Sequence, residues 1–160
     1  MKISKKLNDA INTQIGEELF ASNGYANMAA YFDTLGLSRL SAMYFEQSEE
    51  EREHAMKFIH YLMEVEGEVA IPTIPVTPST FDSVKAALEA AMTWEKDVTE
   101  RINKLMDMAI DEKDYATQDF LRWFVTEQVE EEANVSHLLT LVDALGDRSI
   151  ISIEHLLPQK

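Results

Sequence analysis

The feature that most constrains this chain is a set of four long apolar stripes at helical spacing, each interrupted by polar side chains near its middle. Apolar residues recur in steps of three and four, as in Val84, Leu88 and Ala91, which places each stripe on one face of a helix. An ionised carboxylate in a packed core is very costly unless a cation pairs with it. The stripes therefore predict a helical core that also holds a cation. The interruptions, at comparable depths in the four stripes, are Glu18, Glu51 with His54, Glu95, and Gln128 with Glu131.

The loops indicate how the four helices connect. Residues 35–37 and 111–114 permit only tight antiparallel turns, whereas the segment containing Ile71–Pro78 is long enough to run the length of a bundle. The sequence thus predicts a single all-α domain, residues 1–160. It is an antiparallel four-helix bundle with one long crossover between the second and third helices and a short C-terminal fifth helix. The expected helices span about 5–34, 37–66, 82–111, 115–145 and 149–157.

Composition restricts the class of protein. At 160 residues and 46% hydrophobic content, the chain can bury one substantial core. It has no cysteine, which excludes disulfides, thiolate zinc sites and iron–sulfur clusters. The formal charge of −15 argues against nucleic-acid binding, which needs basic surfaces. The sequence has neither a signal peptide nor an apolar run that could span a bilayer, so we expect a cytoplasmic protein with no membrane partner.

The polar interruptions have the composition of a metal centre. Glu51 and His54 form a Glu-x-x-His pair, which puts two ligands one turn apart on one helix face. Carboxylates with one imidazole and no thiolate favour a di-iron or di-manganese centre over structural zinc. In this hypothesis Glu51 bridges two metals, Glu18 and His54 complete one site, and Glu95 with Glu131 completes the other. Gln128 is a neutral amide, which we expect to ligate weakly or to lie beside the ligands.

Other residues have both an ordinary and a functional interpretation. A histidine alone in an apolar stripe is usually a hydrogen-bonded core residue, and for His54 only the polar groups on the other three helices favour a ligand. Tyr25, seven residues after Glu18, is either a redox-active phenol or a structural tyrosine. The remaining acidic group is either a solvated face or a third, weaker metal site beside the pair; it consists of Glu50, Glu127 and Glu130.

Four stretches carry a family resemblance: Leu7–Tyr25, Gln47–Phe58, Trp94–Lys96 and Asp114–Glu132, the last containing the run EQVEEE. Through them the chain resembles the non-haem ferritins of the prokaryotic type over essentially its whole length. The resemblance implies a ferritin-like fold and a shell of 24 identical subunits that oxidises Fe(II) and stores Fe(III) as mineral. It further implies a first iron site at Glu18, Glu51 and His54; a second at Glu51, Glu95 and Glu131 with Gln128 nearby; a tyrosine beside them at Tyr25; and a third iron site at Glu50, Glu127 and Glu130.

Three positions separate the chain from relatives or from the usual pattern. Haem-binding bacterioferritins, like rubrerythrins, carry a second Glu-x-x-His, and the equivalent run Glu131–Asn134 has none, so no haem is expected. The terminal piece Ile150–Leu157 is shorter than the fifth helix that lines the fourfold channels in the family. At the threefold channels, Asp119 keeps one of two acidic residues usual in the family, and Arg122 occupies the other position.

The favoured function is ferroxidase action, in which O2 or H2O2 takes one electron from each of two Fe(II) ions. One rival is a di-iron oxygenase, which would need a cavity for an organic substrate. Another is a helical bundle without catalytic activity that binds a partner, which would leave the buried acids without a cation.

Overall fold

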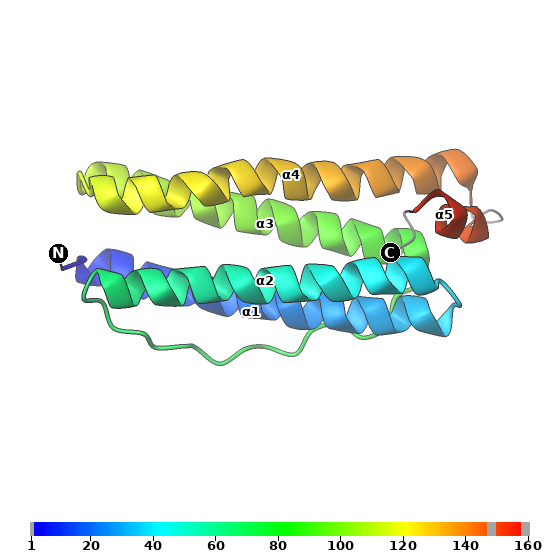
Figure 1. Cartoon of the computed structure of the whole chain (residues 1–160), viewed down its shortest axis with the longest axis horizontal. Coiled ribbons are helices and arrows are strands. Elements are labelled where there is room, and N and C mark those ends of the chain that lie inside the picture. The colour runs from blue at the N-terminus through cyan, green and yellow to red at the C-terminus, as the bar shows by residue number, and fades with distance from the viewer. Residues whose placement is uncertain (1, 147–149, 158–160) are drawn as a thin grey trace.

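The computed structural model describes residues 2–146 and 150–157, and within them it contains helices and no strand. Figure 1 shows an antiparallel pair α1–α2 packed beside a second pair α3–α4, with the crossover running along the bundle from the end of α2 to the start of α3. The short α5 covers the end where α4 finishes. This is the ferritin-like four-helix bundle that the sequence predicted. The helices are α1 Lys5–Thr34, α2 Ser38–Glu64, α3 Val84–Asp111, α4 Tyr115–Leu145 and α5 Ile150–Leu156.

The predicted boundaries of α1 and α4 agree with the structure, whereas those of α2 and α3 were up to two residues too wide. Helix α3 begins at Val84 because Ser83 has an extended backbone (φ −162°) and its side chain accepts a hydrogen bond from the Ala86 amide. Helix α2 ends before Glu66, which adopts a left-handed conformation (φ 56°). Of the expected fifth helix, residue 149 lies outside the described residues, and Leu157 follows the last helical residue.

The crossover is fixed to α1 by two asparagines. Asn12 donates to the Glu68 carbonyl (2.7 Å) and accepts from the Ala70 amide (2.7 Å), while Asn8 accepts from the Glu68 amide (2.8 Å). Further along, Pro72 packs so closely against Gly16 that a Cβ there would clash with its ring. The loop backbone is thereby paired without being part of a sheet.

Helix α5 docks onto the start of α2 by a reciprocal exchange of hydrogen bonds. The N-cap of α2, Leu37, has no side-chain acceptor, and the Glu154 carboxylate instead accepts from the amides of Arg39 (2.8 Å) and Leu40 (3.1 Å). In return, Arg39 Nη1 donates to the carbonyls of Glu154 (2.8 Å) and Leu157 (3.0 Å). Each helix end thus supplies the partners that the other lacks.

The hydrophobic core is divided into two clusters. One lies toward α5 and includes Tyr25, Phe32 and Leu138, and the other lies toward the opposite end and includes Ile11 and Phe58. The polar residues that interrupt the four stripes lie between the two clusters. In the described part of the chain, no helix is long and apolar enough to cross a bilayer.

Candidate metal centre

The six interrupting side chains are all buried, as their places in the stripes predicted. Their exposed fractions range from 0% for Glu18 to 4% for His54, Gln128 and Glu131. They come from all four long helices: Glu18 from α1, Glu51 and His54 from α2, Glu95 from α3, and Gln128 and Glu131 from α4.

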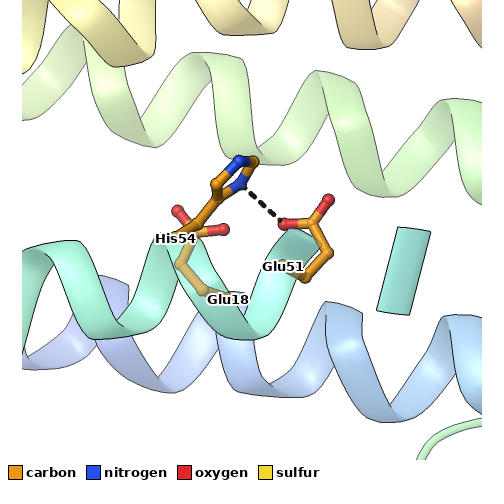
Figure 2. A group of neighbouring side chains, drawn as sticks. All are labelled: Glu18, Glu51 and His54. Atoms are coloured by element: carbon orange, nitrogen blue, oxygen red, sulfur yellow. Dashed lines mark hydrogen bonds and ion pairs between the residues drawn. The ribbon is translucent and has the colours of Figure 1, made fainter. Parts of the chain in front are cut away.

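Two triads of side chains form the centre. Glu18, Glu51 and His54 each offer a ligand atom within 4.8 Å of the others, and so do Glu51, Glu95 and Glu131. Figure 2 shows the first triad, in which Glu18 from α1 meets the α2 pair and His54 Nδ1 lies 3.2 Å from Glu51 Oε2. Because Glu51 belongs to both triads, its carboxylate is placed to bridge two neighbouring ions.

The helices that carry the first triad are held in register by a pair of serines. The Ser22 hydroxyl donates to the Ser48 carbonyl (2.7 Å), and the Ser48 hydroxyl donates to the Ser22 carbonyl (2.8 Å). Ser22 lies one turn after Glu18, and Ser48 lies one turn before Glu51. This exchange between α1 and α2 therefore sets the two glutamates at the same level.

Glutamine amides orient the carboxylates. Gln14 Nε2 donates to Glu18 Oε1 (2.9 Å), and Gln47 Nε2 donates both to Glu51 Oε1 (2.9 Å) and to Glu131 Oε2 (2.8 Å). Neither glutamine was predicted from the sequence to lie at the site. The available signal was spacing, because each lies four residues before the glutamate on its own helix.

Glu95 is held from two sides. The Tyr25 hydroxyl donates to Glu95 Oε1, and Gln128 Nε2 lies 3.2 Å from Glu95 Oε2 and 3.2 Å from the Glu95 carbonyl. Tyr25 is fully buried, with its ring 5.5 Å from that of Trp94. In the structure, Gln128 and Tyr25 thus contact a member of the second triad.

The electrostatics of the centre are those of acids without a counter-ion. Burial, and then the charge of Glu51, raise the pKa of Glu18 well above its usual value and that of Glu95 to about 7. Burial and the charges of Glu95 and Glu51 raise the pKa of Glu131 to about 9. A divalent cation would reverse this by stabilising the ionised forms.

The donor set fits a hard or borderline metal ion. Within the described residues, no lysine or arginine pairs with a glutamate of the two triads, and Glu18 Oε2 is buried without a hydrogen-bond partner. An orphaned carboxylate oxygen that faces other carboxylates is an available ligand. Carboxylate oxygens with one imidazole suit iron or manganese.

The third acidic group is only partly assembled. Glu127 Oε1 lies 3.9 Å from His54 Nε2, and Glu127 forms a further triad with His54 and Glu131. Glu50 and Glu130 are exposed, and neither belongs to the three triads found among the described residues. The structure therefore places Glu127 beside the main centre and the other two at the surface.

Comparison with known proteins identifies the family of the chain. The family described as Ferritin-like domain matches residues 8–145. A bacterial non-heme ferritin of Bacteroides fragilis is 37% identical over 158 residues, which cover 99% of this chain and 99% of that protein. A bacterial non-heme ferritin of Staphylococcus saprophyticus is 38% identical over 148 residues, which cover 92% and 88%. The crystal structure of an open pore ferritin from the hyperthermophilic archaeon Archaeoglobus fulgidus gives a TM-score of 0.95 at 38% identity, covering 99% of this chain and 98% of that one. On this combined evidence, the chain belongs to the ferritin family, among the non-haem ferritins of the prokaryotic type.

Proposed function

We propose that the buried centre is a ferroxidase site, where two Fe(II) ions bind as substrates and are oxidised to Fe(III). Iron storage is the function of the family to which the chain belongs. The observation that carries the proposal is the pair of buried triads sharing Glu51, with no lysine or arginine paired to their glutamates in the described part of the chain. In this proposal Glu18 and His54 complete one iron site, and Glu95 and Glu131 complete the other.

The chemistry follows from the ligands. Each Fe(II) gives up one electron, and O2 takes the two electrons with two protons to become H2O2. Alternatively, H2O2 takes two electrons and two protons, and its O–O bond breaks to give two waters. Anionic carboxylate oxygens are hard donors that favour the more highly charged Fe(III) product over Fe(II).

The surrounding residues would keep the ligands in place while the charge of the ions changes. Gln47 holds a bridging and a terminal carboxylate together, and Gln128 with Tyr25 orients Glu95. We include Tyr25 among the catalytic residues because its hydroxyl donates to Glu95, a proposed iron ligand. Glu50, Glu127 and Glu130 are proposed as the third iron site, and Glu127 is the member that already contacts the centre.

We further propose that the chain assembles into a cytoplasmic cage of 24 identical subunits in which ferric mineral is deposited. Family membership supports this. A particle mass of hundreds of kilodaltons after aerobic iron loading would support storage.

The rival oxygenase has little support. The cavity that touches Tyr25 and Glu131 measures about 20 Å³, which is too small for an organic substrate.

The test is Fe(II) oxidation by a variant with alanine at Glu18, Glu51 and His54. Fast oxidation should be lost while the circular dichroism spectrum stays helical. The matched control is Glu53→Ala, which removes an exposed carboxylate from the same stretch of α2 and should keep the wild-type rate. Wild-type kinetics in the triple variant would reject the ferroxidase assignment.

A further inference from the structure

A small cavity adjoins the metal centre on the side toward α5. Its volume is about 20 Å³, enough for one water or for a molecule of two heavy atoms. Its wall is mostly apolar, and the lining residues with polar side-chain groups are Tyr25, Tyr44, Gln47, Glu131 and Asn134. Two of these five, Gln47 and Glu131, are joined by the hydrogen bond that orients the second triad.

The Tyr44 hydroxyl is buried in this region without a hydrogen-bond partner among the described residues. The side chain is 3% exposed, and its ring is held between those of Tyr25 (5.6 Å) and Phe32 (5.2 Å). A buried hydroxyl without a partner is costly, so a polar molecule beside it would be stabilised by a hydrogen bond. The Gln47 amide uses its Nε2 on the two carboxylates and offers its Oε1 as an acceptor.

The cavity lies beside a groove at the surface. A groove of about 750 Å³ lies along the α2 and α4 side chains. Residues that line both the groove and the cavity are Met43, Gln47, Asn134 and Leu138. Because these four side chains border both spaces, movement of any of them would join the groove to the cavity.

We propose that this cavity binds one molecule of hydrogen peroxide, in exchange with water, and that the Tyr44 hydroxyl donates the hydrogen bond that holds it. The inference rests on the proposed ferroxidase function. A hydroxylic guest can accept from Tyr44 and donate to Gln47 Oε1, whereas O2 has no proton to donate and gains little from either group. The bound peroxide takes one electron from each of two Fe(II) ions and two protons from solvent, its O–O bond breaks, and two waters leave.

The experiment compares the two oxidants in wild-type protein and in Tyr44→Phe, which removes the hydroxyl and keeps the ring. Fe(II) oxidation is measured with hydrogen peroxide under anaerobic conditions and separately with O2. The ratio of kcat/KM for peroxide to kcat/KM for O2 should fall about three- to tenfold in the variant, which is the effect of one uncharged hydrogen bond. The control is Tyr61→Phe, whose hydroxyl pairs with Thr117 and which lies about two helical turns beyond His54 on α2; its ratio should equal that of wild type.

A second measurement does not depend on the variant's folding. Crystals of the Zn(II)-loaded wild-type protein, soaked in peroxide, should show two-atom density within hydrogen-bonding distance of Tyr44. A single water that peroxide does not displace, or an unchanged oxidant ratio in a folded Tyr44→Phe variant, would overturn the inference. If wild-type protein oxidised Fe(II) with neither oxidant, the proposed function itself would fail, so the two failures are distinguishable.

Discussion

The stability of the metal-free protein should fall as pH rises, because buried carboxyl groups of the centre stay protonated in the folded state. Glu131 is 4% exposed and has its pKa raised to about 9. In the unfolded chain the same carboxyl titrates near 4.5. Between those values the folded state holds a proton that the unfolded state has lost. Since stability rises with pH only where the unfolded state binds more protons, here it must fall.

The size of this pH dependence can be worked out for the single proton that Glu131 retains. Each retained proton changes the free energy of unfolding by about 1.4 kcal/mol per pH unit, so Glu131 alone contributes a loss of about 2 to 3 kcal/mol from pH 6 to pH 8. Glu18 adds to the loss in the same direction. Bound metal ions should flatten the dependence because they replace the protons.

The assay is urea unfolding of chelator-treated protein at pH 6, 7 and 8 and at one protein concentration, since assembly adds a concentration dependence. In the Glu131→Gln variant, the free energy of unfolding should fall less steeply with pH than in wild type, by about 1.4 kcal/mol per pH unit. Glu53→Gln, which removes an exposed carboxylate, should keep the slope unchanged. If Glu131→Gln and wild type have equal slopes, Glu131 is ionised in the metal-free fold and the reasoning is wrong.

Three further substitutions test how the site is supported. Ser48→Ala should destabilise the protein by about 0.5–1.5 kcal/mol, because it removes the hydrogen bond from the Ser48 hydroxyl to the Ser22 carbonyl; thermal unfolding measures this, and an unchanged melting temperature would contradict the register role. Gly16→Ala should cost about 1–3 kcal/mol by pushing Pro72 outward, and proteolysis of the crossover should accelerate; equal cleavage rates would show that the loop adapts freely. Glu154→Ala should remove about 1 kcal/mol of capping from α2, seen as faster amide exchange at residues 39 and 40, and unchanged exchange there would refute the capping role.

The fold could be predicted because each stripe is continuous and each loop is either very short or very long. The stripes also predicted which acids are buried, since Glu18, Glu51, Glu95 and Glu131 occupy positions that apolar residues would otherwise fill. These predictions need only the spacing along one helix.

The parts that could not be predicted depend on distances between helices. Gln47 joins carboxylates from α2 and α4, and nothing in the α2 sequence alone shows how near Glu131 lies. Likewise, Glu50, Glu127 and Glu130 were grouped because each adjoins a proposed ligand or its amide neighbour in sequence, and that pattern does not show that Glu127 Oε1 lies 3.9 Å from His54 Nε2. The iron-binding roles of all these residues stay predictions.

The division of the core into two clusters has a mechanical consequence. Apolar packing holds each end of the bundle, whereas at mid-length the helices meet through a layer of buried polar side chains. Metal ions bound in this layer would link all four helices at one level. Bound iron would then stabilise the middle of the bundle. In a subunit without iron, local opening should occur most readily at this middle layer, while the apolar clusters at both ends stay packed.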